Sequence, residues 1–257
     1  MEAEIVMSPY LWAAAACIML FAGITQGALG FGFPTISTPL LVLMTDLKTA
    51  IILNLLPNLT VNVIHTLSGG NWSASLGRYW PVAAWVLVGS ALGATFIILA
   101  PQEPVRLLLA AAIIAYLYQH RLAHLDWSWL ARRPGLSAAV FGLSGGFFSG
   151  SVNNSLPPLL VYFTLLGLEV TAMTQILNLC FLGGKVVQGA TLGLAGEISL
   201  VAVAANVPLT LVGLAGMWIG SRLQRRISKE TYSRLLRWVL FAIAFILTWQ
   251  GMRYFLR

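Results

Sequence analysis

Two uncharged stretches of the sequence are too long to be single membrane-spanning helices. Leu11–Thr45 runs for 35 residues without a charge, and Gly135–Gly167 runs for 33. An unbroken helix of the first length would measure about 52 Å, whereas the hydrocarbon core of a bilayer is about 30 Å thick. Helix breakers cluster in the middle of both stretches, at Gly27–Pro39 and Gly145–Pro158. Each stretch is therefore predicted to be two helical pieces joined by a non-helical turn.

The composition places these stretches in a membrane. Hydrophobic residues make up 58% of the 257 positions and charged residues 9%, against about 25% charged in soluble domains. So few charges cannot cover a water-soluble globule, which excludes an ordinary soluble enzyme. We predict an all-α polytopic membrane protein with one transmembrane domain over residues 1–257. The further predicted spans are Ile51–Leu67, Pro81–Ala100, Val105–Gln119, Thr171–Leu194, Ile198–Gly220 and Trp238–Gly251. Val105–Gln119, which is short, is the weakest of these predictions.

The basic excess has two readings. Fifteen Lys+Arg against eight Asp+Glu give a formal net charge of +7, which could suggest a nucleic-acid partner. The basic residues form short clusters between apolar runs, however, as the positive-inside rule requires of membrane proteins. We therefore expect a lipid bilayer and no nucleic acid around this chain. Met1–Tyr10 has two glutamates and no basic cluster, so no cleaved signal peptide is expected.

The two broken stretches are similar to each other in sequence. An offset of 119 positions aligns three groups of residues: Gly23 with Gly142, Gly27 with Gly146, and Pro39–Val42 with Pro158–Val161. Chance similarity between glycine-rich apolar segments is the alternative explanation. We predict two repeats, 11–120 and 134–253, joined by a basic cytoplasmic linker, 121–133. Each repeat would be one broken segment followed by three transmembrane helices.

The basic residues predict how the repeats are oriented. If Gly135–Gly167 crosses the membrane once, six basic residues lie on one side and eight on the other. If it instead returns to its own side as a re-entrant hairpin, Arg78, the linker and the 222–237 loop share one side, with ten basic residues against four. The hairpin satisfies the positive-inside rule and gives the two repeats inverted topology. Inverted repeats with broken helices are typical of secondary transporters, which bind substrate at the breaks.

One charged residue, Lys185, is embedded in a predicted span. A charge at membrane depth is costly and by default functional. The alternative is a lysine that snorkels to the interface near Glu197. Helical spacing places amide-rich stripes on one face of each of two spans: Thr171, Gln175 and Asn178 with Lys185 in the second half, and Asn54, Asn58 and Asn62 in the first. The alternative role for these amides is to hold helices together.

A cation with amide donors beside the breaks suits a small oxyanion. Half-helix N-termini at the breaks would add backbone N–H groups. The predicted substrate-binding residues are Gln26, Gly30, Gly32, Asn54, Asn58, Ser149, Asn153, Asn154, Gln175, Asn178 and Lys185. We expect no cofactor, no metal ion and no catalytic residue, because every carboxylate lies in a terminus or loop and no metal-ligand spacing or catalytic motif occurs. His65 is expected to be structural or interfacial rather than a proton relay.

The two broken segments carry a family resemblance. "GITQGALGFGFPTISTPLL" and "GLSGGFFSGSVNNSLPPLL" each precede a span that contains Ile-Leu-Asn. This arrangement, over nearly the whole chain, resembles the sulfite exporter TauE/SafE family of bacterial inner-membrane permeases. The sequence departs from the commoner family pattern in "SVNNSLPP", where adjacent asparagines replace a glycine-rich turn.

The resemblance implies a multi-pass inner-membrane protein that moves small sulfur-containing anions, sulfite or organosulfonates, more often outward than inward. Alternating access without ATP is the expected mechanism, and a homodimer is one expected assembly. A non-transporting membrane scaffold or biogenesis factor is the alternative, although it would not explain an embedded lysine beside amides. A membrane-embedded enzyme would need a nucleophile, a metal or an acid–base pair in the spans, and the sequence offers none.

Overall fold

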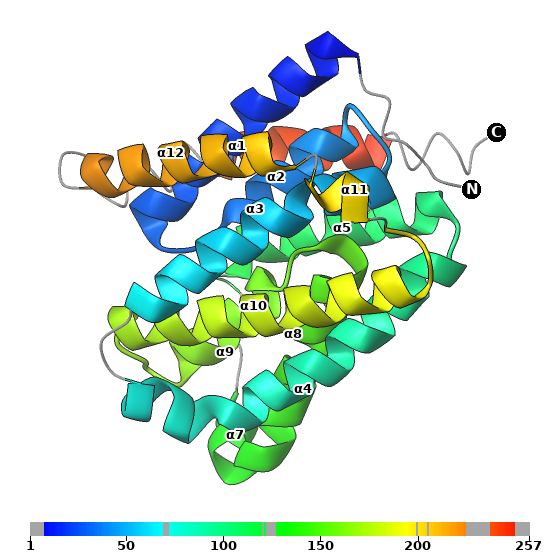
Figure 1. Cartoon of the computed structure of the whole chain (residues 1–257). Helices are drawn as coiled ribbons and strands as arrows, with labels where there is room; N and C mark the ends of the chain where they lie inside the picture. Colours follow the sequence, from blue (N-terminus) through cyan, green and yellow to red (C-terminus); the bar gives the residue numbers. More distant parts are fainter. Residues whose placement is uncertain are drawn as a thin grey trace.

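A computed structural model of the chain is α-helical, without strands, throughout the residues it describes (Figure 1). These residues are 8–68, 72–119, 121, 127–198, 200–204, 206–224 and 237–249. Among them, six helices are long and apolar enough to cross a membrane: Pro9–Leu29, Leu47–Ser68, Gly77–Leu99, Pro134–Val152, Val170–Leu194 and Ala202–Leu223. The prediction of an all-α polytopic membrane protein is confirmed.

The first long stretch is indeed two helices. Helix α1 (Pro9–Leu29) ends at Gly30, and α2 (Phe33–Val42) begins after Gly32. Both glycines have positive φ, 85° and 107°, a backbone conformation that costs glycine little. The second residue of α2 is Pro34, which is favoured in a first helical turn because its missing N–H would be unbonded there. The break is shorter than the cluster of breakers predicted, because the segment from Gly27 to Leu29 continues α1.

The second long stretch repeats this design with different residues. Helix α8 (Pro134–Val152) and α9 (Leu156–Leu165) are separated by Asn153, Asn154 and Ser155. Asn153 has a φ of 58° and is the one non-glycine residue with positive φ in the described part of the chain. Asparagine is among the few residues that adopt this conformation routinely.

The two breaks correspond at a different offset from the one that the sequence suggests. Asn153 occupies the position of Gly30, and Pro157 that of Pro34, each 123 positions later in the chain. The difference from the offset of 119 is four residues, about one helical turn. Glycines recur every four residues in both α1 and α8, so glycine matches alone cannot distinguish the two registers.

Eight further helices complete the described bundle. Helix α5 has 16 residues and measures about 24 Å, less than the hydrocarbon core, as expected of the weakest predicted span. The eight are α3 (Leu47–Ser68), α4 (Trp72–Leu99), α5 (Gln102–Leu117), α7 (Ser128–Arg132), α10 (Val170–Leu194), α11 (Leu200–Ala204), α12 (Val207–Leu223) and the helix Arg237–Trp249.

Glycines bring two pairs of helices into backbone contact, α1 with α12 and α4 with α8. A Cβ atom on Gly27 would lie 2.0 Å from the carbonyl oxygen of Met217, and one on Gly146 would lie 2.2 Å from that of Val86. Both pairs are parallel, since contacts advance along both partners together: Gly23 meets Gly213, and Gly27 meets Met217. Small residues that let backbones approach are a common means of helix association in membranes. Each pair joins one helix from each half of the sequence.

The helix directions define the two ends of the bundle. Helices α3 and α10 are antiparallel, because Gln175 near the start of α10 bonds Thr66 near the end of α3, while Lys48 and Glu197 pair at the opposite end. We name the end where α3 ends and α4 begins the basic end. It carries the described residues Arg78, Arg132, Arg133 and Arg222; residues 225–236 of the 222–237 loop, and residues 122–126 of the linker, lie outside the described residues.

These directions place both ends of each hairpin. Helix α1 runs parallel to α12, which begins at the end of the bundle opposite the basic end, and α2 leads back there to α3. Helix α8 runs parallel to α4, which begins at the basic end, and α9 leads back there to α10. The hairpin α1–α2 thus starts and finishes opposite the basic end, and α8–α9 starts and finishes at it.

Gly27→Ala is expected to destabilise the protein. The new methyl group would collide with the backbone of Met217 and Ser221, and α1 could relieve the clash only by moving away from α12. Gly77→Ala is the matched control, because a Cβ there meets nothing within 4 Å. We expect Gly27→Ala to lower the melting temperature of the purified protein by several degrees and Gly77→Ala to leave it unchanged or higher. Equal melting temperatures for the two variants would contradict the close α1–α12 contact.

Candidate functional site

An amide latch joins the first break to α10. The Gln26 Nε2 donates to Asn178 Oδ1 at 2.9 Å and to the Gly30 carbonyl at 3.4 Å, while Gln26 Oε1 accepts from the Phe33 N–H at 3.0 Å. The Asn178 Nδ2 donates to the carbonyl oxygens of Gly30 at 2.8 Å and Thr174 at 2.7 Å. Both amides are fully buried and fully used. Gln26 and Asn178, hereafter the amide latch, hold the α1–α2 turn against α10.

Hydroxyl groups on α2 join the first hairpin to the second break. The Thr35 hydroxyl donates to Asn154 Oδ1 at 3.0 Å, and the Asn153 Nδ2 donates to Thr38 Oγ1 at 2.7 Å. The Asn54 Nδ2 lies 3.4 Å from the same Thr38 oxygen, and the Ser37 hydroxyl donates to Asn54 Oδ1 at 2.5 Å. The two breaks, far apart in sequence, thus meet in one buried polar cluster. We name Thr35, Ser37, Thr38, Asn54, Asn153 and Asn154 the hairpin junction.

One donor in the hairpin junction has no partner. The Nδ2 of Asn154 is buried and makes no hydrogen bond to any residue that the structure describes. A buried donor without a partner costs about 1–3 kcal/mol. Such a group suits a site that a ligand oxygen can enter.

The backbone contributes less to this site than the sequence suggests. The Phe33 N–H is bonded to Gln26, and the N–H groups of Asn153 and Asn154 are bonded to the carbonyl oxygens of Ser149 and Phe148. Three of the N–H groups expected to face an anion are therefore occupied. The donors left for a ligand come chiefly from side chains.

Lys185 is buried beside the last turn of α8. Its side chain is 1% exposed, and its Nζ donates to Gln188 Oε1 at 2.5 Å. The Gln188 Nε2 in turn donates to the carbonyl oxygens of Gly150 at 2.7 Å and Ser149 at 3.2 Å. Lys185 is thereby tied to the residues that directly precede the second break.

No carboxylate lies within ion-pair distance of Lys185 among the described residues. Glu197, the group near which the alternative places a snorkelling Lys185, pairs with Lys48 at 2.9 Å. The burial of Lys185 disagrees with an interfacial lysine. A charged ammonium group at this depth is costly unless a counter-charge or hydrogen bonds compensate it.

Three of the predicted residues take no part in the amide latch, the hairpin junction or the contacts of Lys185 and Gln188. Asn58 accepts a hydrogen bond from Asn62 within α3, at 2.7 Å. Gln175 bonds the Thr66 carbonyl near the basic end. Gly32 is the residue before α2, where its positive φ shapes the turn.

Sequence reasoning also missed functional candidates. The hydroxyls Thr35, Ser37 and Thr38 stand between two prolines in a short apolar helix, and this local richness in hydroxyl groups was the available signal. Gln188 follows Lys185 by one helical turn and connects it to α8.

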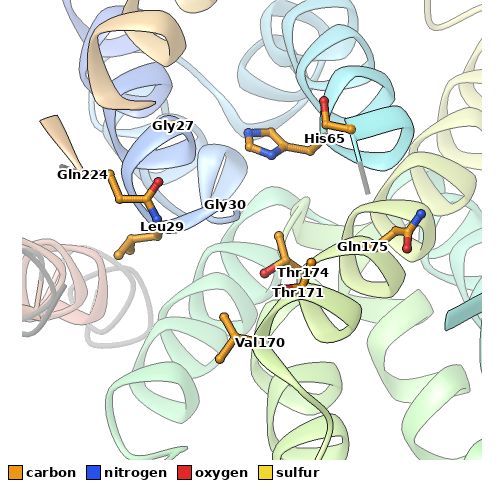
Figure 2. A pocket seen from close by; sticks show the side chains of 10 residues that line it. Gly27, Leu29, Gly30, His65, Val170, Thr171, Thr174, Gln175 and Gln224 are labelled. Atoms are coloured by element: carbon orange, nitrogen blue, oxygen red, sulfur yellow. The ribbon is translucent and has the colours of Figure 1, made fainter. Parts of the chain in front are cut away.

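A cavity of about 240 Å³ opens beside the first break, at the basic end (Figure 2). His65 from α3 and Thr174 from α10 project into the space beside Gly30 (Figure 2). The Nε2 atom of His65 is buried and has no partner among the described residues. The lining residues are Gly27, Leu29, Gly30, His65, Ser68, Val170, Thr171, Thr174, Gln175 and Gln224. No group of three or more metal-ligating side chains occurs in the described part of the chain.

The family of the chain follows from a sequence comparison. The family model described as sulfite exporter TauE/SafE matches residues 15–247, which include both breaks, the amide latch, the hairpin junction and Lys185. No curated protein and no solved structure matches the chain. Because the match covers nearly the whole chain, this multi-pass membrane protein belongs to the sulfite exporter TauE/SafE family.

Proposed function

We propose that this protein is a secondary transporter of small sulfur-containing anions, sulfite or organosulfonates, and that it exports them across the bacterial inner membrane. The observation that carries the proposal is the buried Lys185, which has no carboxylate partner in the described part of the chain and is fastened to the second break. Within that break, Asn154 holds a donor without a partner among the described residues. A cation and a free amide donor together select an oxyanion over a cation or an apolar solute.

The anion would bind between the two breaks. Lys185 would supply the positive charge, and Asn154 Nδ2 a hydrogen bond. The four N–H bonds of the amide latch now end on protein oxygens, so Gln26 and Asn178 would become donors to the anion only after the latch opens.

We propose inverted repeats over 11–120 and 134–253 as the basis of alternating access. Two observations support this assignment. The breaks match each other 123 positions apart, and the two hairpins start from opposite ends of the bundle. The pairs α1–α12 and α4–α8, held in backbone contact, would each move as a unit. Their relative rocking would expose the hairpin junction first to one side of the membrane and then to the other.

A membrane scaffold is the remaining alternative. A scaffold would be more stable with an apolar residue in place of the buried Lys185, which has no carboxylate partner among the described residues, because burying a charge costs several kcal/mol. The hairpin junction also leaves Asn154 Nδ2 without a partner among the described residues, whereas a purely structural polar network is expected to satisfy each buried donor.

Access of water to the hairpin junction distinguishes a transporter from a scaffold. In a Cys17→Ser, Cys180→Ala background, we expect Asn154→Cys to react with a membrane-impermeant maleimide, because alternating access wets that position. Val152→Cys, two residues away and equally buried, is the matched control and should stay unlabelled. Labelling of neither cysteine would support a packed scaffold and contradict the transporter.

A further inference from the structure

The cavity beside His65 lies on the basic-end side of the amide latch and lacks a role in the transport site described above. We infer that this cavity is an entry site, at which the transported anion is held before it passes the amide latch. The inference rests on the proposed function. It adds a second site, on one side of the membrane, to the central one.

The cavity presents polar groups to a ligand. Thr171 and Thr174 line it with hydroxyl groups, and the buried Nε2 of His65, which also lines it, has no hydrogen-bond partner among the described residues. An oxyanion can accept hydrogen bonds from several such groups at once.

The charge around the cavity favours an anion. No acidic side chain is among its lining residues; Glu169, which precedes α10, is exposed and does not line it. The described cations Arg78, Arg132, Arg133 and Arg222 lie at this end. Clustered positive charge raises the local concentration of anions at a cleft. At about 240 Å³, the cavity has room for an oxyanion together with water molecules.

The position of Gly30 connects the cavity to the central site. Gly30 lines the cavity, and its carbonyl oxygen accepts hydrogen bonds from both members of the amide latch. Opening the latch therefore removes the barrier between the cavity and the hairpin junction. An anion at Thr174, whose own carbonyl accepts from Asn178, is placed to replace the bonds that the latch loses.

Transport kinetics measured from each side of the membrane test this site. Thr174→Val removes the hydroxyl and nearly conserves the volume. In inside-out membrane vesicles, where the basic end faces the medium, we expect it to raise the KM for sulfite about tenfold with Vmax unchanged. In right-side-out vesicles, the KM should stay within about twofold of the parent value. Thr174→Ser should restore the parent KM, since it restores the hydroxyl.

Thr191→Val is the matched control on the same helix. Among the described residues the Thr191 hydroxyl bonds only the Val187 carbonyl, within α10, so both KM values should be unchanged in this variant. An unchanged KM for Thr174→Val, or an equal rise of the KM on both sides of the membrane, would overturn the entry site. The proposed function would still stand in that case, provided that the parent protein transports sulfite. Absence of sulfite transport by the parent protein would overturn both.

Discussion

Lys185→Met is expected to reduce sulfite transport at least about 30-fold without loss of the fold. The substitution removes the buried cation that would face the anion, and loss of one partner from a buried charge pair costs about 2–5 kcal/mol of binding. Lys185 is 1% exposed and has no carboxylate partner among the described residues. Replacing it by an apolar chain of similar length should leave the melting temperature unchanged or raise it.

Sulfite flux and thermal stability, measured together, identify a binding role for Lys185. Flux is measured with radiolabelled sulfite in proteoliposomes, and stability by thermal unfolding of the same preparation. A purely structural lysine would lose stability and flux together. A Lys185→Met protein that transports sulfite at the parent rate would contradict the assignment of Lys185 to the anion site.

Asn154→Asp is expected to abolish transport, with flux reduced about 100-fold or more. The aspartate keeps the oxygen that accepts from Thr35 and the shape of the side chain. It replaces the one unpartnered donor of the hairpin junction, within the described residues, by a negative charge. Loss of a hydrogen bond to a charged group costs about 1.5–3 kcal/mol, and repulsion between like charges adds several more.

Asn154→Ala separates these two contributions. It removes the donor without adding a charge, so sulfite flux should fall about tenfold and remain measurable. The predicted order of fluxes is parent, then Ala, then Asp. An Asp variant that carries sulfite as well as the Ala variant would show that the anion does not approach Asn154.

Much of the fold could be predicted because its determinants are local. Stretches too long for one span must break. The first break falls at Gly30 and Gly32 because both have positive φ, a backbone conformation that glycine adopts readily. The basic residues, counted under the two possible topologies, were enough to favour the hairpin. The burial of Lys185 followed from the uncharged helix around it.

The parts that could not be predicted depend on contacts between distant residues. The amide latch joins Gln26 to Asn178 across 152 positions, and no local pattern records such a pair. The glycines fit an offset of 119 as well as one of 123, because they are spaced by one helical turn. The backbone N–H groups offered to the anion are occupied by Gln26 and by α8, which only the assembled hairpins reveal.

The cavity was missed for a similar reason. Its polar lining comes from the end of α3 and the start of α10, where His65 and Thr171 look like ordinary interfacial residues in sequence. It forms because these two helix ends meet beside Gly30. The proximity of three segments, not the character of any one residue, makes the site.

Sulfite flux in proteoliposomes that contain the purified protein tests the central claim most directly. Radiolabelled sulfite should cross these membranes faster than protein-free ones, and excess sulfoacetate or taurine should compete, while acetate should not. That result would establish the anion class and direct attention to Lys185 and the two breaks. No flux of sulfite or of any sulfonate would contradict the account, even with the fold intact.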